Sequence, residues 1–220
     1  MKKNKLVGIS LLAMVAVFAG GAYLYKKKNS EEQRLTLEKN RKILSRDHSP
    51  VFGNPEAPVE IVEFLDPECE TCGNFYPLVK NIMHQFPGKI KLVIRYAPFH
   101  QDSIFAVKIL EASRNQNKYW ETLAKLFEKQ PEWGDHHNPN PMLIWTYLPG
   151  LGLNTDQIKR DMEDSEITNR INIDIADLNT FSVKKTPTFF VNGQPLETFG
   201  YEQLFEAVKK EVEKSMKNKE

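Results

Sequence analysis

Cysteine is scarce in this chain, because its 220 residues contain only two, Cys69 and Cys72. A network of structural disulfides is therefore excluded, and so are four-cysteine zinc sites and iron–sulfur clusters. An excess of charge of one sign is also absent, because 30 lysines and arginines stand against 29 aspartates and glutamates. A net charge of +1 gives no electrostatic reason to expect binding to nucleic acid.

The composition is that of a foldable protein. Hydrophobic residues make up 40% of the chain and charged residues 27%, which excludes a wholly disordered protein. The length suffices for one large domain, or for a smaller domain that carries an insertion.

One long apolar run lies near the N-terminus. Residues 6–25 have no charged side chain, and three lysines flank them on each side. A helix of this length rises about 30 Å and matches the hydrocarbon layer of a bilayer, whereas the apolar region of a secretory signal has about 7–15 residues. The length favours an uncleaved anchor, with cleavage after Ala19 or Ala22 as the alternative. We therefore predict a signal anchor or signal peptide over residues 1–28 and a charged linker or stalk over residues 29–49.

Either form of processing leaves the rest of the chain outside the cytoplasm. We expect a periplasmic or other extracytoplasmic location, anchored in the cytoplasmic membrane through residues 6–25. Such a compartment is oxidising, so a cysteine pair there can be a working disulfide.

The remainder predicts a central sheet with helices on its faces. Residues 59–65 are rich in β-branched side chains, and Asn192-Gly193 is a strong hairpin signal. The expected strands are 59–65, 89–96, 188–191 and 194–197. The expected helices are 69–86, a helical block over 103–180 with a helix that begins at Asn154 or Thr155, and a last helix after Gly200.

The two cysteines form a C-x-x-C motif where a strand gives way to a helix. Cys69 falls at the helix N-terminus, where unpaired N–H groups and the helix dipole favour a thiolate. Cys72 lies about one turn further on. This arrangement suits a two-step exchange, in which Cys69 forms a mixed disulfide and Cys72 resolves it.

Three other interpretations of the pair compete with redox chemistry. A structural disulfide over so short a loop would constrain the unfolded chain little. A metal site would need two further ligands, for which only His100 or the pair His136-His137 can be nominated. Two inert thiols would be unusual in an exported chain. We therefore favour a redox function for the cysteine pair, and we expect no metal and no other cofactor.

Two stretches of the sequence resemble a known family. Gly53-Asn54-Pro55, Ala57-Pro58-Val59, Glu63-Phe64, Asp66 and the C-x-x-C motif together are similar to the DsbA-like branch of the thioredoxin superfamily. Thr186–Gly193 (TPTFFVNG) is similar to its second signature. The resemblance covers residues 50 to about 214. It implies an α/β thioredoxin-like fold in two parts, residues 50–100 and 181–217, with a helical insertion over 101–180.

The resemblance also implies roles for single residues. Pro187 matches a cis-proline that faces the cysteine pair, and Thr186 matches the residue beside the sulfurs. Glu63 matches a buried acid that assists proton transfer at the second cysteine. Alternation along the strand favours burial of Glu63, because its face is otherwise aliphatic.

The sequence departs from the family pattern between the cysteines, where strongly oxidising members have Pro-His and this chain has Glu70-Thr71. A carboxylate about 6 Å from the Cys69 sulfur would cost the thiolate roughly 0.7–3 kcal/mol. The helix terminus contributes about 0.3–2 kcal/mol in the other direction, so the two effects nearly cancel. We predict a higher pKa for Cys69, and a less oxidising pair, than in Pro-His relatives.

The sequence thus predicts an extracytoplasmic thiol–disulfide oxidoreductase that acts on cysteine-containing exported proteins. The resemblance implies a membrane redox partner that either oxidises or reduces it, and the direction stays open. A dimeric isomerase is disfavoured because residues 26–49 are too few for a dimerisation domain. The alternative function is a redox-inert peptide-binding module or a metal carrier on the same fold.

Overall fold

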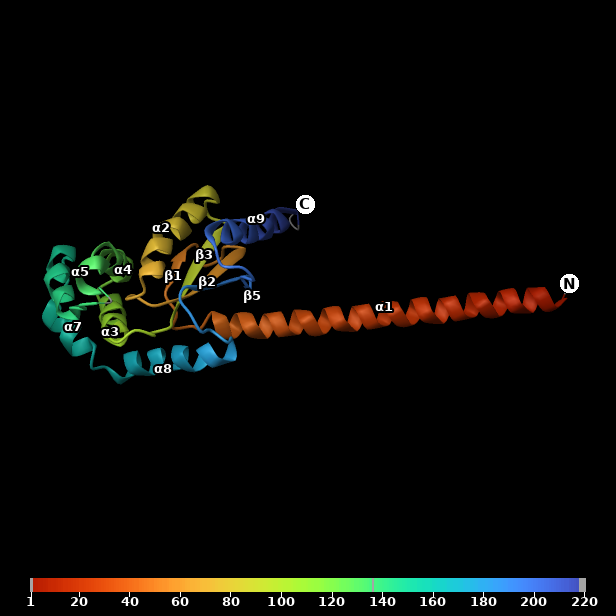
Figure 1. Ribbon diagram of the computed structural model, residues 1–220, viewed down its shortest axis with the longest axis horizontal. Coiled ribbons are helices and arrows are strands. Elements are labelled where there is room, and N and C mark those ends of the chain that lie inside the picture. Colours follow the sequence, from red (N-terminus) through yellow and green to blue (C-terminus); the bar gives the residue numbers. More distant parts are fainter. Residues whose placement is uncertain (1, 136, 218–220) are drawn as a thin grey trace. The chain divides into compact units, whose positions relative to one another are not determined.

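The computed structural model describes residues 2–135 and 137–217, and side chains at residues 21, 23–32, 34–135 and 137–217. It divides the chain into two compact units, Met1–Lys42 and Ile43–Glu220. The first unit is formed by helix α1 (Lys2–Leu44), whose last residues belong to the second unit (Figure 1). The helix continues through residue 28, where the sequence predicted a boundary. Arg34 supports it with ion pairs to Glu31 and Glu38, one turn away on either side.

The predicted membrane span, residues 6–25, lies mostly outside the residues whose side chains are described. Among the described residues, none of the helices combines the length and apolar character that crossing a membrane requires.

A five-stranded sheet forms the centre of the second unit, in the order β1-β3-β2-β4-β5. Strands β2 and β3 pair in parallel, and the other neighbours pair antiparallel. Three strands match the predicted ranges closely, and β5 is shorter than predicted. The bounds are β1 (Val51–Gly53), β2 (Val59–Leu65), β3 (Ile90–Tyr96), β4 (Thr188–Val191) and β5 (Gln194–Pro195).

Strand β1 was not predicted from the sequence. It has three residues and exists because it pairs with β3, with Val51 opposite Val93. Gly53 ends it with φ +94°, and a Cβ at this position would lie 2.9 Å from the carbonyl oxygen of Ile90. Glycine is required here by both the backbone conformation and the close approach of β3.

Both faces of β2 are buried, as its nearly continuous apolar sequence indicated. Helices α2 (Glu70–Gln85) and α9 (Tyr201–Lys217) lie on one side of the sheet, and α8 (Ser165–Thr180) lies on the other (Figure 1). Val59, Ile61 and Leu65 belong to the larger core with α2 and α9. Val62 and Phe64 pack with Leu178 of α8 and with Leu44.

Helical structure fills the stretch between β3 and β4, as the helical block predicted. Asn154 caps α7, accepting a hydrogen bond from the main-chain N–H of Gln157 at 3.0 Å. The insertion does not form a unit separate from the sheet, because α8 returns to cover the sheet's second face. Besides α8, the helices are α3 (Ser103–Arg114), α4 (Tyr119–Glu128), α5 (Gln130–Trp133), α6 (Ile144–Tyr147) and α7 (Thr155–Asp161), with 3₁₀ turns at Pro141–Leu143 and Leu148–Leu151.

A buried ionic network joins the end of α1 to this unit. Arg95 on β3 is fully buried and donates to Asp174 at 2.8 Å and to Asp177 at 2.6 Å, both on α8. Arg95 also donates to the carbonyl oxygens of Ile43 and Leu44. These bonds satisfy a guanidinium that would otherwise be costly to bury. The second unit therefore begins at Ile43, before the boundary predicted at residue 49.

Candidate active site

Cys69 lies at the N-terminus of α2. It is the N-cap residue, with φ −72° and ψ 116°, and its carbonyl oxygen accepts the first helical bond from Gly73 at 3.2 Å. Its own N–H donates to the carbonyl oxygen of Asp66 at 3.1 Å, which closes a tight turn after β2. The side chain is 8% exposed, and both cysteines are free thiols in this structure.

The pKa of Cys69 is lowered to about 5. The largest cause is a hydrogen bond from the Cys72 thiol; burial opposes it, and a hydrogen bond with the Thr186 side chain adds to the lowering. The main-chain N–H groups of Cys72 and Thr71 contribute further. A thiol with this pKa is mostly ionised at neutral pH and is a nucleophile.

Cys72 has the opposite character. Its side chain is fully buried, and the main-chain N–H of Asp66 points to its sulfur at 3.5 Å. Burial first, then the hydrogen bond with Cys69 and the charge of Glu63, hold the pKa of Cys72 well above its ordinary value. The motif therefore pairs an ionised outer sulfur with a protonated inner one.

The second signature of the sequence lies beside the outer sulfur. The Thr186–Pro187 peptide bond is cis, and the Cys69 sulfur lies 3.4 Å from the carbonyl oxygen of Thr186. Residues separated by more than a hundred positions thus meet at the sulfur. Pro187 opens onto a groove of about 330 Å³ that also contains Thr188, Phe189 and Phe199.

Glu63 is buried, with 1% of its surface exposed. It lies on the face of β2 that packs against α2, as the alternation indicated. Burial, followed by the charge of Cys69, raises the pKa of Glu63 to about 8. A carboxyl group with this pKa exchanges protons near neutral pH, which is the property needed of a proton carrier for Cys72.

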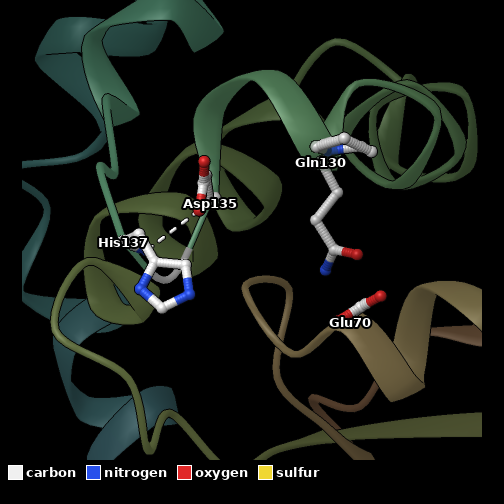
Figure 2. A pocket seen from close by; sticks show the side chains of 6 residues that line it. Glu70, Gln130, Asp135 and His137 are labelled. Atoms are coloured by element: carbon white, nitrogen blue, oxygen red, sulfur yellow. Dashed lines mark hydrogen bonds between the residues drawn. The ribbon is translucent and has the colours of Figure 1, made fainter.

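Glu70 and Thr71, between the cysteines, are exposed. Figure 2 shows the side chain of Gln130 pointing toward Glu70, with Asp135 and His137 to the left of both. These residues line a hollow with a volume of about 330 Å³. It places an open, polar space next to the residue that follows the reactive cysteine.

The hollow is framed by a contact between α5 and the active-site turn. Gln130 donates from Nε2 to the carbonyl oxygen of Pro67 at 2.8 Å. A Cβ at Gly73 would lie 2.5 Å from the Gln130 side-chain oxygen and 3.4 Å from the Phe127 ring. Gly73 thus allows the helical insertion to approach the first turn of α2.

The expected balance of electrostatic effects at Cys69 was incomplete. From the sequence, Glu70 and the helix terminus were expected to nearly cancel. In the structure the strongest influence on the pKa of Cys69 is the hydrogen bond from Cys72. This hydrogen bond was not predicted, because the orientation of the second thiol depends on the folded turn.

Asp66 belongs to the family motif, but no role was predicted from the sequence for it, for Glu68 or for Ser103. Asp66 is fully buried and accepts hydrogen bonds from the Ser103 hydroxyl at 2.6 Å and from the main-chain N–H of Glu68 at 2.9 Å. The His100 ring lies 2.8 Å from the same carboxylate. The sequence did contain a signal for a role of Asp66, because its carboxylate directly follows a buried strand and lies three residues before Cys69.

Two of the three histidines nominated as metal ligands, His100 and His137, lie among the described residues. Within residues 2–135 and 137–217 there is no group of three or more His, Cys, Asp or Glu side chains that could hold a metal ion. His100 bonds to Asp66, and the main-chain N–H of His137 donates to Asp135 at 2.9 Å. His136 lies outside the described residues.

Comparison with known proteins gives consistent results. A thioredoxin family profile matches residues 45–210. A thioredoxin-like oxidoreductase from Silicibacter pomeroyi DSS-3 superposes with a TM-score of 0.67 and 30% sequence identity, covering 77% of this chain and 95% of that one. Oxidised BdbD from Bacillus subtilis gives a TM-score of 0.67 and 25% identity, with 76% of this chain and 94% of that one covered.

A curated relative is the Na(+)/H(+) antiporter NhaA 1 of Mycobacterium sp. (strain KMS), which is 31% identical over 156 residues. The match covers 68% of this chain and 24% of that protein. The chain thus spans about a quarter of the length of the curated relatives it matches. On the family match and the site geometry together, the chain belongs to the thioredoxin family, in the DsbA-like branch of thiol–disulfide oxidoreductases.

Proposed function

We propose that this protein exchanges disulfides with cysteine-containing exported proteins through Cys69 and Cys72. One observation carries the proposal: the pKa of Cys69 is lowered to about 5 while burial holds that of its neighbour Cys72 well above the ordinary value. A low pKa makes Cys69 both a good nucleophile and a good leaving group. An elevated pKa keeps Cys72 protonated until a mixed disulfide has formed.

In the reducing direction, the Cys69 thiolate attacks a client disulfide. One client sulfur leaves as a thiolate, and the other stays bonded to Cys69. Glu63 takes the proton of Cys72, whose thiolate then attacks the Cys69 sulfur. The second client sulfur leaves, the client is reduced, and Cys69 and Cys72 are joined by the disulfide. In the oxidising direction the same steps run in reverse, and the Glu63 carboxyl returns the proton to Cys72.

Client polypeptide has room in two hollows that are lined by residues of the active-site motifs. One is lined by Glu70, which follows Cys69 in the chain, and the other by Pro187. Phe199 in the groove is 39% exposed, and Phe99, whose N–H donates to Asp66, is 46% exposed. Exposed aromatic side chains in this part of the domain suit unfolded segments of clients, which present apolar residues.

The location and the partners follow from the N-terminal sequence and the chemistry. We place the domain on the extracytoplasmic side, held by residues 6–25 in the cytoplasmic membrane, because lysines flank this apolar run on both sides. A membrane redox partner would restore the cysteine pair after each turnover. Since Glu70 lies where Pro-His relatives have no carboxylate, we expect a less oxidising pair than theirs.

The test is to trap the mixed disulfide with the full chain. Cys72→Ser keeps the nucleophile and removes the resolving thiol, so incubation with a disulfide-containing client peptide should accumulate a covalent 1:1 adduct. Cys69→Ser is the matched control and should give no adduct, because the buried Cys72 cannot reach the client. Adducts on Cys69→Ser, or none on Cys72→Ser, would contradict the proposal.

A further inference from the structure

The hollow that contains Glu70 presents negative charge from two parts of the fold. Its volume of about 330 Å³ is at the lower end of the range for ligand pockets, so it suits a single long side chain. The carboxylates of Glu70 and Asp135 are both exposed in it. The described lining residues, none of which is a lysine or an arginine, are Glu70 at the start of α2, Gln130 and Pro131 of α5, and Gly134, Asp135 and His137 after α5.

The side chain of Gln130 supplies a third hydrogen-bond acceptor. It is 5% exposed and points toward Glu70 (Figure 2). Its Nε2 donates to the carbonyl oxygen of Pro67 at 2.8 Å, whereas none of the residues that the structure describes donates a hydrogen bond to its Oε1. This oxygen lies beside Gly73, one turn after Glu70 on the same face of α2. Since buried amide oxygens usually have a donor, an oxygen without one in the lining of a hollow indicates a ligand with N–H groups.

The negative charge of the hollow is not neutralised within the described part of the protein. Among residues 2–135 and 137–217, neither Glu70 nor Asp135 forms an ion pair. Asp135 Oδ1 accepts the main-chain N–H of His137 at 2.9 Å, which orients the carboxylate without adding a charge. Lys129, at the start of α5, lies 2.7 Å from Glu132 and is paired there. A cation from outside is therefore the complementary ligand.

A client held by Cys69 can reach this hollow. Glu70 directly follows Cys69, so their Cα atoms lie about 3.8 Å apart. An extended client advances about 3.3–3.6 Å per residue, so a residue one or two positions from the client cysteine comes within reach of Glu70. Lysine and arginine carry their charge on a long flexible stem, and the guanidinium has five N–H donors for several acceptors.

We propose that this hollow binds a lysine or arginine side chain of the client, and that Glu70 and Asp135 thereby select clients with a basic residue close to the reacting cysteine. Gln130 Oε1 accepts one of the N–H groups of the bound side chain. The proposal rests on the proposed function and names a class of substrate for it. The exchange reaction itself is unchanged, because the bound side chain only holds the client in place.

The experiment compares disulfide peptides that carry arginine, its neutral analogue citrulline, or glutamate two positions before or two positions after the cysteine. Cys72→Ser in the full chain traps the adduct, and the rate of its formation is measured at pH 8 in low salt. Each rate is divided by the rate of the same peptide with 2-mercaptoethanol, because a neighbouring charge also changes the reactivity of the peptide disulfide. In at least one series, we expect a normalised arginine-to-citrulline ratio of about 10 and slower reaction of the glutamate peptide.

Variants of the hollow, each combined with Cys72→Ser, assign this preference. Asp135→Asn keeps the oxygen that accepts from His137 and removes the charge, so the ratio should fall about threefold, as it should in Glu70→Gln. A ratio within one variant cancels any change in the reactivity of Cys69 itself. Asp47→Asn is the matched control, because it removes the same charge from an exposed aspartate that does not line the hollow.

The supporting result is a ratio that falls in both hollow variants, stays at the wild-type value in Asp47→Asn, and shrinks in 1 M salt. Equal normalised rates for the arginine and citrulline peptides in both series would overturn the proposal. A loss confined to Glu70→Gln, or an equal loss in Asp47→Asn, would also overturn it, since the preference would then belong to one carboxylate or to the net charge. If none of the peptides formed an adduct, the proposed function would fail, whereas adducts without selectivity would remove this inference alone.

Discussion

The Glu63 carboxyl group and the Cys72 thiol are both shielded from solvent, and they are near enough to interact electrostatically. Burial is the largest cause of the raised pKa of Cys72, and the charge of Glu63 is a smaller one. Glu63 itself has a pKa of about 8. They come from adjacent elements, β2 and α2, on the same side of the sheet. A thiol that must lose its proton inside the protein thus has beside it a carboxyl group whose pKa lies near neutral pH.

Glu63→Gln tests this pairing kinetically. The amide cannot accept a proton, so release of client from the mixed disulfide by Cys72 should slow by roughly 10²-fold, while attack by Cys69 stays nearly unchanged. Rapid-quench separation of the two steps measures this. Glu60→Gln is the control, because Glu60 is equally buried on the opposite face of β2, 3.1 Å from Lys91. Equal slowing in both variants would contradict the role of Glu63.

Glu63 should also make stability depend on pH. Its pKa is about 8 in the folded chain and 4.5 when unperturbed, so the folded state binds the extra proton between these values. The contribution of Glu63 to the free energy of unfolding should therefore fall as the pH rises from 4.5 through 8, by at most about 5 kcal/mol. Reduced Cys69, whose pKa is lowered in the folded chain, contributes with the opposite sign, so the measurement is the difference between wild type and Glu63→Gln in urea unfolding of the reduced proteins at pH 5, 7 and 9. A difference that does not change with pH would contradict the assignment to Glu63.

Thr186→Val removes the side-chain hydroxyl next to the reactive sulfur. Because a hydrogen bond with this side chain helps to lower the pKa of Cys69, we expect that pKa to rise and the equilibrium with glutathione to move about tenfold towards a less oxidising pair. Thr146→Val provides the control, since Thr146 donates to Leu143 on the helical insertion. An unchanged equilibrium in Thr186→Val would indicate that only its carbonyl oxygen matters.

Glu70→Gln should make the pair more oxidising. The Glu70 carboxylate is exposed next to Cys69, so its repulsion of the thiolate is screened by solvent, and we expect a change of about two- to tenfold in the equilibrium with glutathione. The difference from wild type should shrink in 1 M salt. A difference that salt does not change would point to an altered turn instead of a lost charge.

Arg95→Met tests the network that joins residues 43–44 to the domain. It leaves Asp174 and Asp177 buried without Arg95, so the free energy of unfolding should fall by about 3–5 kcal/mol. The pKa of Cys69 should stay at its wild-type value in the folded variant, because the network lies on the other face of the sheet. Chemical denaturation and thiol titration of the same sample check both statements.

Features encoded by neighbouring residues were predictable from the sequence. The two-sided burial of β2 follows from its apolar run, and the hairpin follows from Asn192-Gly193, whose φ values are +48° and +84°. The start of α2 at the cysteine pair is equally local.

Features that depend on distant residues were not predictable in the same way. Strand β1 exists only through β3, and the contact between Asp66 and His100 joins positions 34 residues apart. The bond between Arg95 and Asp174 spans 79 residues and requires α8 to return across the sheet. The main determinant of the pKa of Cys69, the hydrogen bond from Cys72, was not predictable for a related reason, since it depends on the orientation of Cys72 in the folded turn.

The most direct measurement is the pH dependence of alkylation of reduced Cys69 by iodoacetamide in the full chain, followed by peptide mass spectrometry. The account predicts that the rate rises with a midpoint near pH 5, while Cys72 stays unmodified in the folded protein. A midpoint near the ordinary thiol pKa of about 8.5, or modification of both cysteines at similar rates, would contradict it.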